Sequence, residues 1–291
     1  MDSEAPLHNI LADRYCGLGR FRRVAIRFEF EAETRLTFLR EEQGYKGSAF
    51  HGRFETGLAQ LAPAAWAALC NAAPTIKPYW LAPPLDNALE YQPGHIFHLD
   101  LALFGPAVCH AEACAEALRH TSGEAQLSTL RGRYRLIGSQ ALPFPRECPP
   151  PNNSPSTTRI TLHCTTPLRL QGATRREPDF RSVFKKLLDR LRRLTALEPD
   201  AQPIDEAALH LLLSRAATIA TVRNQLQWFD WPRYSPRQRT WMKLGGFRGQ
   251  ITFAGNLAPF IPYLRLGEWT HLGGKTGFGH GRYRLQIHEG A

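Results

Sequence analysis

The chain has 291 residues, of which 43% are hydrophobic and 21% charged, and its 36 basic side chains outnumber its 26 acidic ones. At roughly 100–200 residues per domain, this length predicts two domains, each large enough for its own core. No uninterrupted run of about 18 apolar residues exists, which excludes a membrane-spanning helix. The N-terminal segment lacks the apolar core of a secretory signal, so we expect a soluble protein of the cytoplasm.

The first half predicts strands that alternate with helices. Apolar residues alternate in FRRVAIRFEF and again in HIFHLDLALF, which is the pattern of half-buried strands. Apolar residues at the spacing of a helix follow the first of these segments. A proline, which suits the first turn of a helix, follows the second. The expected elements are strands at 21–30, 95–104 and 133–139, helices at 47–62 and 106–120, and a proline-rich irregular segment at 74–84.

The segment ECPPPNNSPSTT, residues 147–158, reads as a linker, because its prolines prevent a helix and its polarity prevents a core strand. The second half repeats the order of the first, and its second strand is again weakly marked. Its expected elements are strands at 158–170, 246–254 and 281–287 and helices at 179–195, 204–228 and 259–271. This order predicts an α+β protein of two tandem ferredoxin-like (RRM-like) domains, residues 1–150 and 151–291.

The excess of positive charge lies entirely in the second half. Residues 1–151 contain 15 basic and 16 acidic side chains, whereas residues 152–291 contain 21 basic and 10 acidic ones. Of the 36 basic residues 30 are arginine, whose planar group binds phosphate oxygens and stacks on bases. A GC-rich genome would explain the preference for arginine but not the one-sided charge. We infer a polyanionic partner, and a nucleic acid fits best.

The six cysteines are scattered without a C-x-x-C pair, which argues against a disulfide framework. Cys109, His110 and Cys114 lie close together and are residue types that bind zinc. They fall on a predicted helix, however, where positions 109 and 110 point about 100° apart. We interpret these cysteines as helix-packing residues and expect neither a metal nor another cofactor.

Glycine is densest in HLGGKTGFGHGRYRL, residues 271–285, where five of the nine residues from Gly273 to Gly281 are glycine. Such a segment adopts positive φ values and presents exposed backbone N–H groups to a phosphate chain. Gly274, Lys275 and Thr276 match the end of a nucleotide P-loop, but the glycine required five residues earlier is a tryptophan. We expect an RNA-binding loop at 271–282, with a merely flexible turn as the alternative.

Two further segments combine positive charge with apolar residues. Residues 175–195 predict an amphipathic helix, part of a basic insertion at about 175–200, with eight basic and three acidic residues between Arg175 and Arg193. The polar side of this helix either faces solvent or contacts RNA. In WPRYSPRQRTW, residues 231–241, arginines alternate with aromatic residues that either stack on unpaired bases or pack against a neighbouring helix.

The segment EEQGYKGSAFHGRFETGL, residues 41–58, joins the first strand to the first helix and brings several reactive side chains together. A histidine with an ordinary pKa of about 6.5 accepts a proton near neutral pH. A neighbouring cation stabilises charge that develops on a phosphate. Tyr45, Lys46, His51 and Arg53 therefore suffice for RNA cleavage without a metal, with a structural role for His51 as the alternative.

These pieces together resemble the CRISPR-associated endoribonucleases that cut precursor CRISPR RNA within each repeat, members of the repeat-associated (RAMP) superfamily of tandem ferredoxin-like proteins. The specific match is LRLGEWTHLGGKTGFGHGRYRL, residues 264–285, which resembles the family's last helix and glycine-rich loop. GGFRGQITFAG at 245–255 resembles the strand before that helix. GYKGSAFHGRF at 44–54 resembles the entry to the family's first helix, which often carries the catalytic histidine.

The resemblance implies metal-independent cleavage, in which a general base deprotonates a ribose 2′-hydroxyl and the oxyanion attacks the adjacent phosphate. The products would be a 2′,3′-cyclic phosphate and a 5′-hydroxyl. His51 is then the expected base, Tyr45 a positioning or proton-donating group, and Lys46 or Arg53 the charge stabiliser. The chain departs from the family pattern here, because a catalytic lysine commonly follows the histidine and this chain has Arg53 in that place.

The resemblance also implies binding to CRISPR repeat RNA, retention of the mature CRISPR RNA, and assembly with other subunits of a ribonucleoprotein effector complex. The main alternative is a non-catalytic RNA-binding subunit of such a complex, and a more distant one is a general single-strand-binding protein. The expected RNA-binding residues are Arg22, Arg23, Arg181, Lys185, Lys186, Arg192, Arg193, Arg233, Arg237, Arg239, Arg248, Lys275, Gly277, Phe278, Gly279, His280, Gly281 and Arg282.

Overall fold

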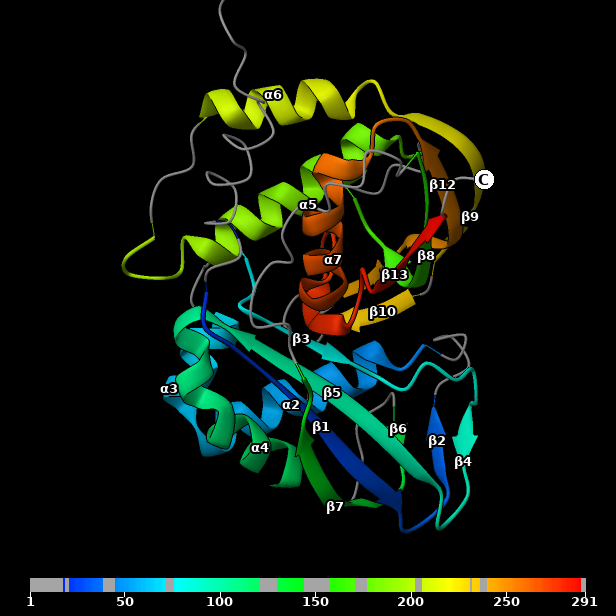
Figure 1. The fold of residues 1–291 in the computed structure, drawn as a ribbon. Helices are drawn as coiled ribbons and strands as arrows, with labels where there is room; N and C mark the ends of the chain where they lie inside the picture. Colours follow the sequence, from blue (N-terminus) through cyan, green and yellow to red (C-terminus); the bar gives the residue numbers. More distant parts are fainter. Residues whose placement is uncertain are drawn as a thin grey trace, which may run out of the picture.

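Two antiparallel sheets of four strands each, one from each half of the chain, organise the computed structural model (Figure 1). The structure describes residues 18, 21–38, 45–71, 76–120, 130–143, 158–170, 177–201, 206–230, 232–235 and 240–288. No helix within these residues is long and apolar enough to cross a membrane.

The first sheet has the strand order β3-β5-β1-β7. Its strands are β1 (Arg23–Ala32), β3 (Tyr79–Ala82), β5 (Ile96–Phe104) and β7 (Tyr134–Ala141). The helices of this half are α2 (Gly47–Leu61), α3 (Pro63–Trp66) and α4 (Ala111–His120), with a π-helical turn η3 (Ala67–Asn71) and a 3₁₀ turn η4 (Gly105–His110). A small second sheet joins β4 (Glu90–Tyr91), β2 (Leu36–Phe38) and β6 (Leu130–Arg131).

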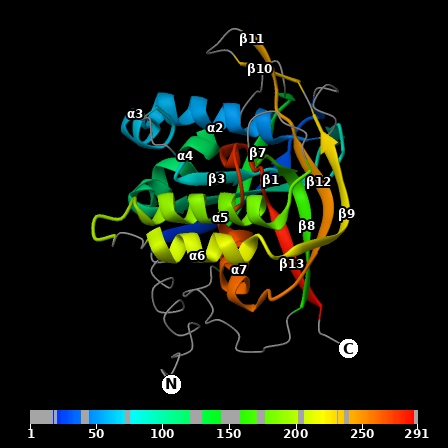
Figure 2. The ribbon, with the colours of Figure 1, turned by 90° about the horizontal axis from the view of Figure 1, so that it is seen from above.

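The second four-stranded sheet has the order β13-β8-β12-β9. Its strands are β8 (Arg159–Leu168), β9 (Ala220–Phe229), β12 (Gly246–Ala254) and β13 (Tyr283–His288). The helical elements are α5 (Phe180–Thr195), α6 (Glu206–Ala216), α7 (Ile261–Thr270) and the 3₁₀ turns η5 (Ala258–Phe260) and η6 (Thr276–Phe278). The hairpin of β10 (Pro232–Ser235) and β11 (Thr240–Lys243) projects away from the body of the molecule (Figure 2).

The two large sheets have the same topology. In each, the first strand of the half lies between the third and the fourth, and the second strand lies at the edge beside the third. This is the strand order of a ferredoxin-like fold, which confirms the predicted fold class. The fold therefore places α2 and α5 at equivalent positions, each leading from the first strand of its half towards the second.

The weakly marked second strands are where the prediction from sequence was least accurate. The helix predicted through residue 228 is wrong, because α6 ends at Ala216 and β9 follows as a strand paired with β12. As an edge strand β9 is exposed along most of its length, so it lacks apolar alternation. Within the segment predicted as irregular, β3 is buried at all four positions and for that reason shows no alternation either.

Three smaller differences concern the remaining expectations. The predicted helix at 106–120 begins with the 3₁₀ turn η4 before α4 starts at residue 111. The interpretation of the cysteines as helix-packing residues is correct for Cys114, which is buried, and wrong for Cys109, which is exposed. Residues 147–157 of the expected linker lie outside the described residues.

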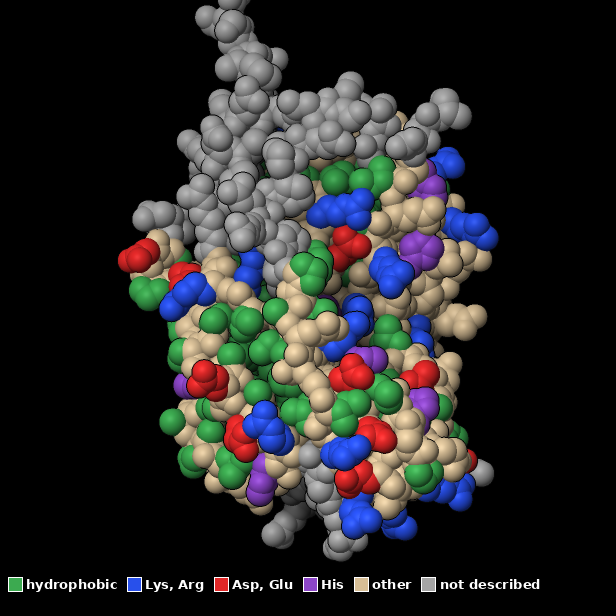
Figure 3. Space-filling view, turned by 60° about the horizontal axis from the view of Figure 1, so that its bottom comes forward, with side chains coloured by type: hydrophobic (Ala, Val, Ile, Leu, Met, Phe, Trp, Pro, Cys, Tyr) green, Lys and Arg blue, Asp and Glu red, His purple; other side chains and the backbone are tan. Residues whose placement is uncertain are grey.

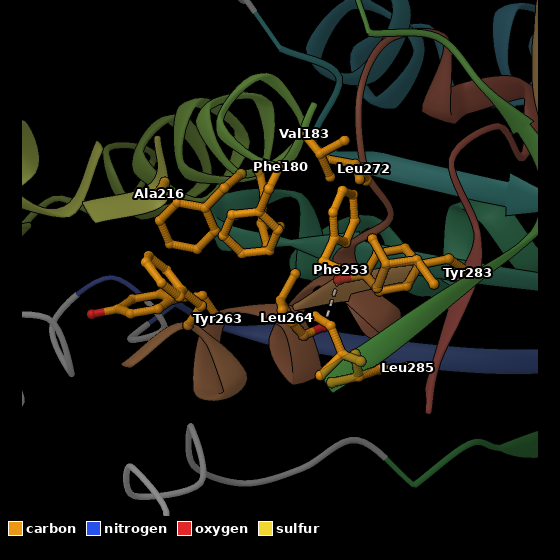
Figure 4. Close-up of a cluster of buried hydrophobic side chains, with 14 of the residues drawn as sticks. Phe180, Val183, Ala216, Phe253, Tyr263, Leu264, Leu272, Tyr283 and Leu285 are labelled. Carbon is orange, nitrogen blue, oxygen red and sulfur yellow. Dashed lines mark hydrogen bonds between the residues drawn. The ribbon is translucent and has the colours of Figure 1, made fainter. Parts of the chain in front are cut away.

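Each half has its own apolar core. In the second half, one face of α5 packs with α7 and the inner face of the sheet, and Figure 4 shows Phe180, Val183 and Phe253 meeting there. The Tyr283 hydroxyl donates a hydrogen bond to the carbonyl oxygen of Leu264 at 2.5 Å, so this deeply buried phenol is satisfied. In the first half α2 and α4 cover the sheet, and the core is rich in phenylalanine.

A third apolar cluster joins the two halves. Leu194 of α5 packs among buried side chains of the first half that include Trp80 and Phe104. The Trp80 indole lies parallel to the His271 ring, 4.5 Å away, and its Nε1 donates to the carbonyl oxygen of Trp269 at 2.7 Å. The residues that follow α7 are therefore held against the edge strand β3, which fixes the start of the glycine-rich segment relative to the first half.

Candidate active site

The glycine-rich loop of the second half lies directly against the beginning of α2 in the first half. Gly47, the first residue of α2, makes this approach possible. A Cβ atom at Gly47 would lie 2.3 Å from the carbonyl oxygen of Phe278 and 2.5 Å from the Tyr45 ring. Such distances are far below van der Waals contact, so only glycine fits where the two segments meet.

His51 lies at this contact, one turn into α2. Its imidazole stacks on the Phe278 ring with 3.9 Å between centroids and is only 3% exposed. The Nε2 atom is 3.0 Å from the hydroxyl oxygen of Tyr79 on β3, and Nδ1 is 3.6 Å from Oε2 of Glu55, one turn further along α2. Side chains from two elements of the first half and one loop of the second thus surround the ring.

The glycines of the loop allow it to approach these side chains closely. A Cβ at Gly277 would lie 3.2 Å from His51 Nε2 and 3.3 Å from the Tyr79 hydroxyl oxygen, so Gly277 faces both atoms. Gly279 has φ +79° and would bring a Cβ to 2.6 Å from Pro83. The expectation of exposed N–H groups is wrong for 277–281, because these residues are buried, and several of the loop's N–H groups make backbone hydrogen bonds.

Tyr45 anchors the loop to the entry of α2. Its hydroxyl donates a hydrogen bond to the carbonyl oxygen of Phe278 at 2.5 Å, and its ring meets the His280 ring edge-on at 5.6 Å. His280 is fully buried, and burial together with the charges of Arg169 and Lys275 lowers its pKa to about 3. At neutral pH His280 is therefore uncharged, and the structure places it as a packing element of the loop.

Lys46 and Arg53, the two expected charge stabilisers, lie with their charged groups inside the first half. The Lys46 side chain is 0% exposed, and its Nζ lies 2.8 Å from Oδ1 and donates at 2.9 Å to the carbonyl oxygen of Asp86. Arg53 Nε donates to the Tyr134 hydroxyl at 2.9 Å, and its guanidinium lies over the Tyr134 ring. Of the four expected catalytic residues, His51 and Tyr45 contact Phe278 of the loop.

The expected RNA-binding residues fall into several groups. Five basic residues of α5 lie on its outer side, exposed or half-buried, and they are Arg181, Lys185, Lys186, Arg192 and Arg193. Arg22 pairs with Glu198, Arg23 lies near the Phe21 ring, Arg248 lies over Phe229, and Lys275 is exposed at the head of η6. Arg237 and Arg239, with the side chain of Arg233, lie outside the described residues.

The face of the second sheet opposite its helices is strongly basic. In antiparallel strands, paired residues share a face, and Ile160, Leu162 and Phe253 point inward. None of the residues in these four described strands is acidic. The outward residues are Arg159, Thr161, His163, Arg223, Gln225, Gln227, Arg248, Gln250, Thr252, Arg284, Gln286 and His288.

The first half is different, because many of its arginines are paired with acids. Arg27 makes two hydrogen bonds to Asp100 at 2.8 and 2.9 Å, and Arg135 pairs with Glu31. Figure 3 shows a face on which acidic and basic side chains lie side by side, as such pairs require. Burial lowers the pKa of Arg282, the charge of Asp100 raises it, and the charges of Arg284 and Arg27 lower it, so charges from both halves act on this guanidinium.

Sequence reasoning missed three polar residues that surround His51, namely Glu55, Cys70 and Tyr79. The signal for Glu55 was its spacing, because residues four apart on a helix share a face. Cys70 belongs to the π-helical turn η3, and Tyr79 to the strand whose pattern was too uniform to be recognised. Only the tertiary fold brings these two next to His51.

Residues 162–283 match the model of the family described as CRISPR-associated endoribonuclease Cas6, and residues 67–143 match one described as an N-terminal domain. No curated protein sequence matches the chain significantly. Among solved structures, a Cas6 product complex aligns with a TM-score of 0.62 and 20% identity over 91% of this chain and 100% of the other.

Thermus thermophilus Cas6 aligns with a TM-score of 0.56 and 20% identity, over 91% of this chain and 99% of the other. A RAMP protein described as binding different RNA substrates aligns with a TM-score of 0.52 and 13% identity, over 90% of this chain and 99% of the other. At these identities the likeness shows a shared fold. The match to the Cas6 family thus covers residues 162–283, and the likeness in fold extends over 91% of the chain.

Proposed function

We propose that the protein cleaves the repeats of precursor CRISPR RNA without a metal ion, by attack of a ribose 2′-hydroxyl on the adjacent phosphate. The products are a 2′,3′-cyclic phosphate and a 5′-hydroxyl. One observation carries the proposal: His51 stacks on Phe278, a residue of the glycine-rich loop within the span that matches the Cas6 family. A histidine suited to acid–base chemistry thus lies against the loop that we propose binds RNA.

In this proposal Nε2 of His51 is the general base. The imidazole is only 3% exposed, so the RNA must displace Phe278 from it before a ribose hydroxyl can reach Nε2. Tyr45 then acts as a positioning residue, since its hydroxyl holds the carbonyl oxygen of Phe278 rather than pointing at a substrate. We assign stabilisation of the phosphate to Lys275, which is exposed at the head of η6, rather than to Lys46 or Arg53.

The RNA itself is proposed to lie on the basic surfaces of the second half. The described strands of its sheet carry no acidic residue, and the outer side of α5, on the other side of the sheet, carries five further basic side chains. A duplex stem is recognised through its phosphates and its wide minor groove, which such surfaces fit. Tight retention of the cleaved RNA and docking to other subunits of an effector complex complete the proposal.

A second candidate function is a non-catalytic RNA-binding subunit of an effector complex. The burial of His51 favours this function. So do the contacts of Lys46 with Asp86 and of Arg53 with Tyr134, which hold both cations inside the first half. The two candidates share the fold and the basic surfaces and differ only in whether RNA is cut.

The deciding experiment is a cleavage assay in EDTA with hairpin repeat RNA. Wild type, His51→Ala and an RNA with a 2′-deoxy sugar at the cut site are compared, with a general base expected to contribute about 10²–10⁴-fold. Loss of cleavage with the deoxy sugar and a fall of at least about 100-fold in His51→Ala support the proposal. Tight binding without cleavage by the wild type would favour the non-catalytic subunit, and rapid exchange of cleaved RNA against competitor would overturn its retention.

A further inference from the structure

Four polar side chains form a closed ring at His51. Its Nε2 is 3.0 Å from the Tyr79 hydroxyl, which is 3.7 Å from Sγ of Cys70. Burial, followed by the charge of Glu55 and a hydrogen bond with it, raises the pKa of Cys70 to about 11. The ring closes where Oε2 of Glu55 lies 3.6 Å from Nδ1 of His51.

The protonation of this ring is restricted by its chemistry. Burial raises the pKa values of Cys70 and of Tyr79, so near neutral pH the thiol and the phenol keep their protons. Glu55 is one-third exposed and is the only carboxyl group of the ring, which makes it the source of negative charge. The neutral imidazole of His51 carries its proton on either Nδ1 or Nε2, and the two tautomers have different chemical consequences.

With the proton on Nε2, the lone pair of Nδ1 would face the Glu55 carboxylate, and two electron-rich groups would meet across 3.6 Å. With the proton on Nδ1, the positive end of that N–H dipole lies 3.6 Å from the carboxylate, an electrostatic attraction at a distance just longer than a hydrogen bond. The lone pair of Nε2 then accepts the hydrogen bond that the Tyr79 hydroxyl donates at 3.0 Å. Only the second arrangement makes both contacts favourable.

We propose that Glu55 is a positioning residue that keeps the proton of His51 on Nδ1 and leaves the lone pair of Nε2 available beside Gly277. The catalytic consequence rests on the proposed function, whereas the choice of nitrogen does not. When the loop shifts, the ribose hydroxyl replaces the Tyr79 phenol as the donor to Nε2.

The proton of that ribose hydroxyl then passes to Nε2, and the electron pair of its O–H bond forms the new bond to phosphorus. The bond from phosphorus to the 5′-oxygen breaks, and this oxygen leaves with the electron pair. It takes up the proton that the imidazolium returns. The Glu55 carboxylate stabilises the imidazolium between these two transfers.

Other groups near His51 do not supply this effect. From the remaining elements packed around it come Cys70 of η3, Tyr79 of β3 and Cys114 of α4, all with pKa values raised by burial. Lys77 donates from its Nζ to the carbonyl oxygen of Cys70 at 2.6 Å. The loop contributes Lys275 and the neutral His280. Among the described residues named here Glu55 is the only acid, so we attribute the dependence on a nearby negative charge to it.

The test is ¹⁵N NMR of the imidazole nitrogens in the full-length protein, assigned with His51→Ala. The wild type is expected to carry its proton on Nδ1. Glu55→Gln, which removes the charge, is expected to lower the pKa of His51 by about one unit. Glu55→Leu, which also removes the acceptor, is expected to shift the proton towards Nε2. A proton on Nε2 in the wild type, or an unchanged His51 pKa in both variants, would overturn the proposal.

A second readout connects the ring to cleavage. In single-turnover assays Glu55→Gln is expected to cut about 10-fold more slowly near pH 7, with the acid limb of its pH profile displaced to lower pH. Glu112→Gln on α4 removes an exposed carboxylate and is the matched control, with an unchanged rate and profile. Absence of cleavage by the wild type would overturn the proposed function, and the NMR measurement would still decide the role of Glu55.

Discussion

The helices α2 and α5 occupy equivalent places in the two halves, yet they are built from different residues. The buried face of α5 is mainly aliphatic and aromatic, with Arg190 and Thr195 as its polar members, and its N-terminus is capped by Asp179, whose Oδ1 accepts from the backbone N–H of Ser182 at 2.7 Å. The buried face of α2 includes glycine, serine, histidine and arginine, and no side chain caps its start. Helix α5 therefore contributes mainly to stability. The equivalent helix α2 buries fewer apolar side chains and instead holds a cluster of polar ones.

The largest expected effect concerns the core face of α5. Phe184 is fully buried, and its ring lies 4.8 Å from that of Phe260. Phe184→Ala should lower the free energy of unfolding by about 3–5 kcal/mol, because it removes buried apolar area and leaves a cavity. Urea denaturation measures this loss, and Leu61→Ala, which removes a 44% exposed side chain from α2, should change it by no more than about 0.5 kcal/mol. Equal losses in the two variants would contradict the assignment of α5 as the stabilising helix.

The next effect concerns the ion pair at the start of α2. Burial alone would raise the pKa of Asp86, but hydrogen bonds from Lys46 and Tyr91 and the charge of Lys46 lower it overall. A carboxyl with a lowered pKa contributes stability above its unfolded pKa of about 3.9, and this contribution is lost as the pH falls through the lower folded value.

Asp86→Asn should therefore destabilise the protein by about 2 kcal/mol at pH 7, since the buried Lys46 loses the attraction of the Asp86 carboxylate. The same variant should lose less stability than the wild type between about pH 4 and pH 2. Chemical denaturation across this range is the measurement. Glu90→Gln, which removes an exposed partner of Arg35, is the control and should change stability by less than about 1 kcal/mol. If the stability of Asp86→Asn fell with pH as steeply as that of the wild type, the ion pair of Lys46 and Asp86 would not be what stabilises the start of α2.

A smaller effect is expected where the loop faces His51. Gly277→Ala would place a methyl group 3.2 Å from His51 Nε2, at a residue whose φ does not require glycine. Cleavage should fall about 10-fold, equivalent to about 1.4 kcal/mol, while the urea midpoint moves little. At Gly274 the nearest atom to an added Cβ is 3.7 Å away, so Gly274→Ala should cleave at the wild-type rate. Identical cleavage rates for the two variants would show that the space at Gly277 does not affect catalysis.

The smallest effect concerns the cap of α5. Asp179→Ala removes the acceptor for the N–H of Ser182 and should cost about 1 kcal/mol of stability with cleavage unchanged. Thermal denaturation of the two proteins side by side measures the loss. A change in cleavage without a change in stability would mean that α5 contributes to the RNA site through more than its outer side.

The sequence was sufficient for those parts of the fold that have a strong local pattern. The strands β1, β5, β8, β12 and β13 and the helices α2, α5 and α7 follow from apolar periodicity and from prolines and glycines. Strand β9 was missed because an exposed edge strand shows no alternation, and β3 because a wholly buried strand shows none either. Apolar residues alternate with polar ones only in a strand that is buried on one face and exposed on the other, and neither of these strands is.

The candidate site was predictable only in part, for a similar reason. The sequence placed Tyr45 and His51 in one segment and Phe278 in another, but the contact between the segments depends on how the halves pack. Lys46 and Arg53 have the charge that the chemistry needs, and only the structure shows that Asp86 and Tyr134 hold them. Glu55 lies one turn from His51 on α2, whereas Cys70 and Tyr79 carry no motif and approach His51 only because η3 and β3 pack near α2.

The contact between Tyr45 and Phe278 joins residues that are 233 positions apart in the chain. On a ribosome adding roughly 5–20 residues per second, roughly 10–50 seconds pass between the synthesis of the two. During that interval a nascent chain already carries His51 but not the loop that completes its surroundings. The surroundings of His51 are therefore completed only after residue 278 has been synthesised, long after the first half of the chain is able to fold.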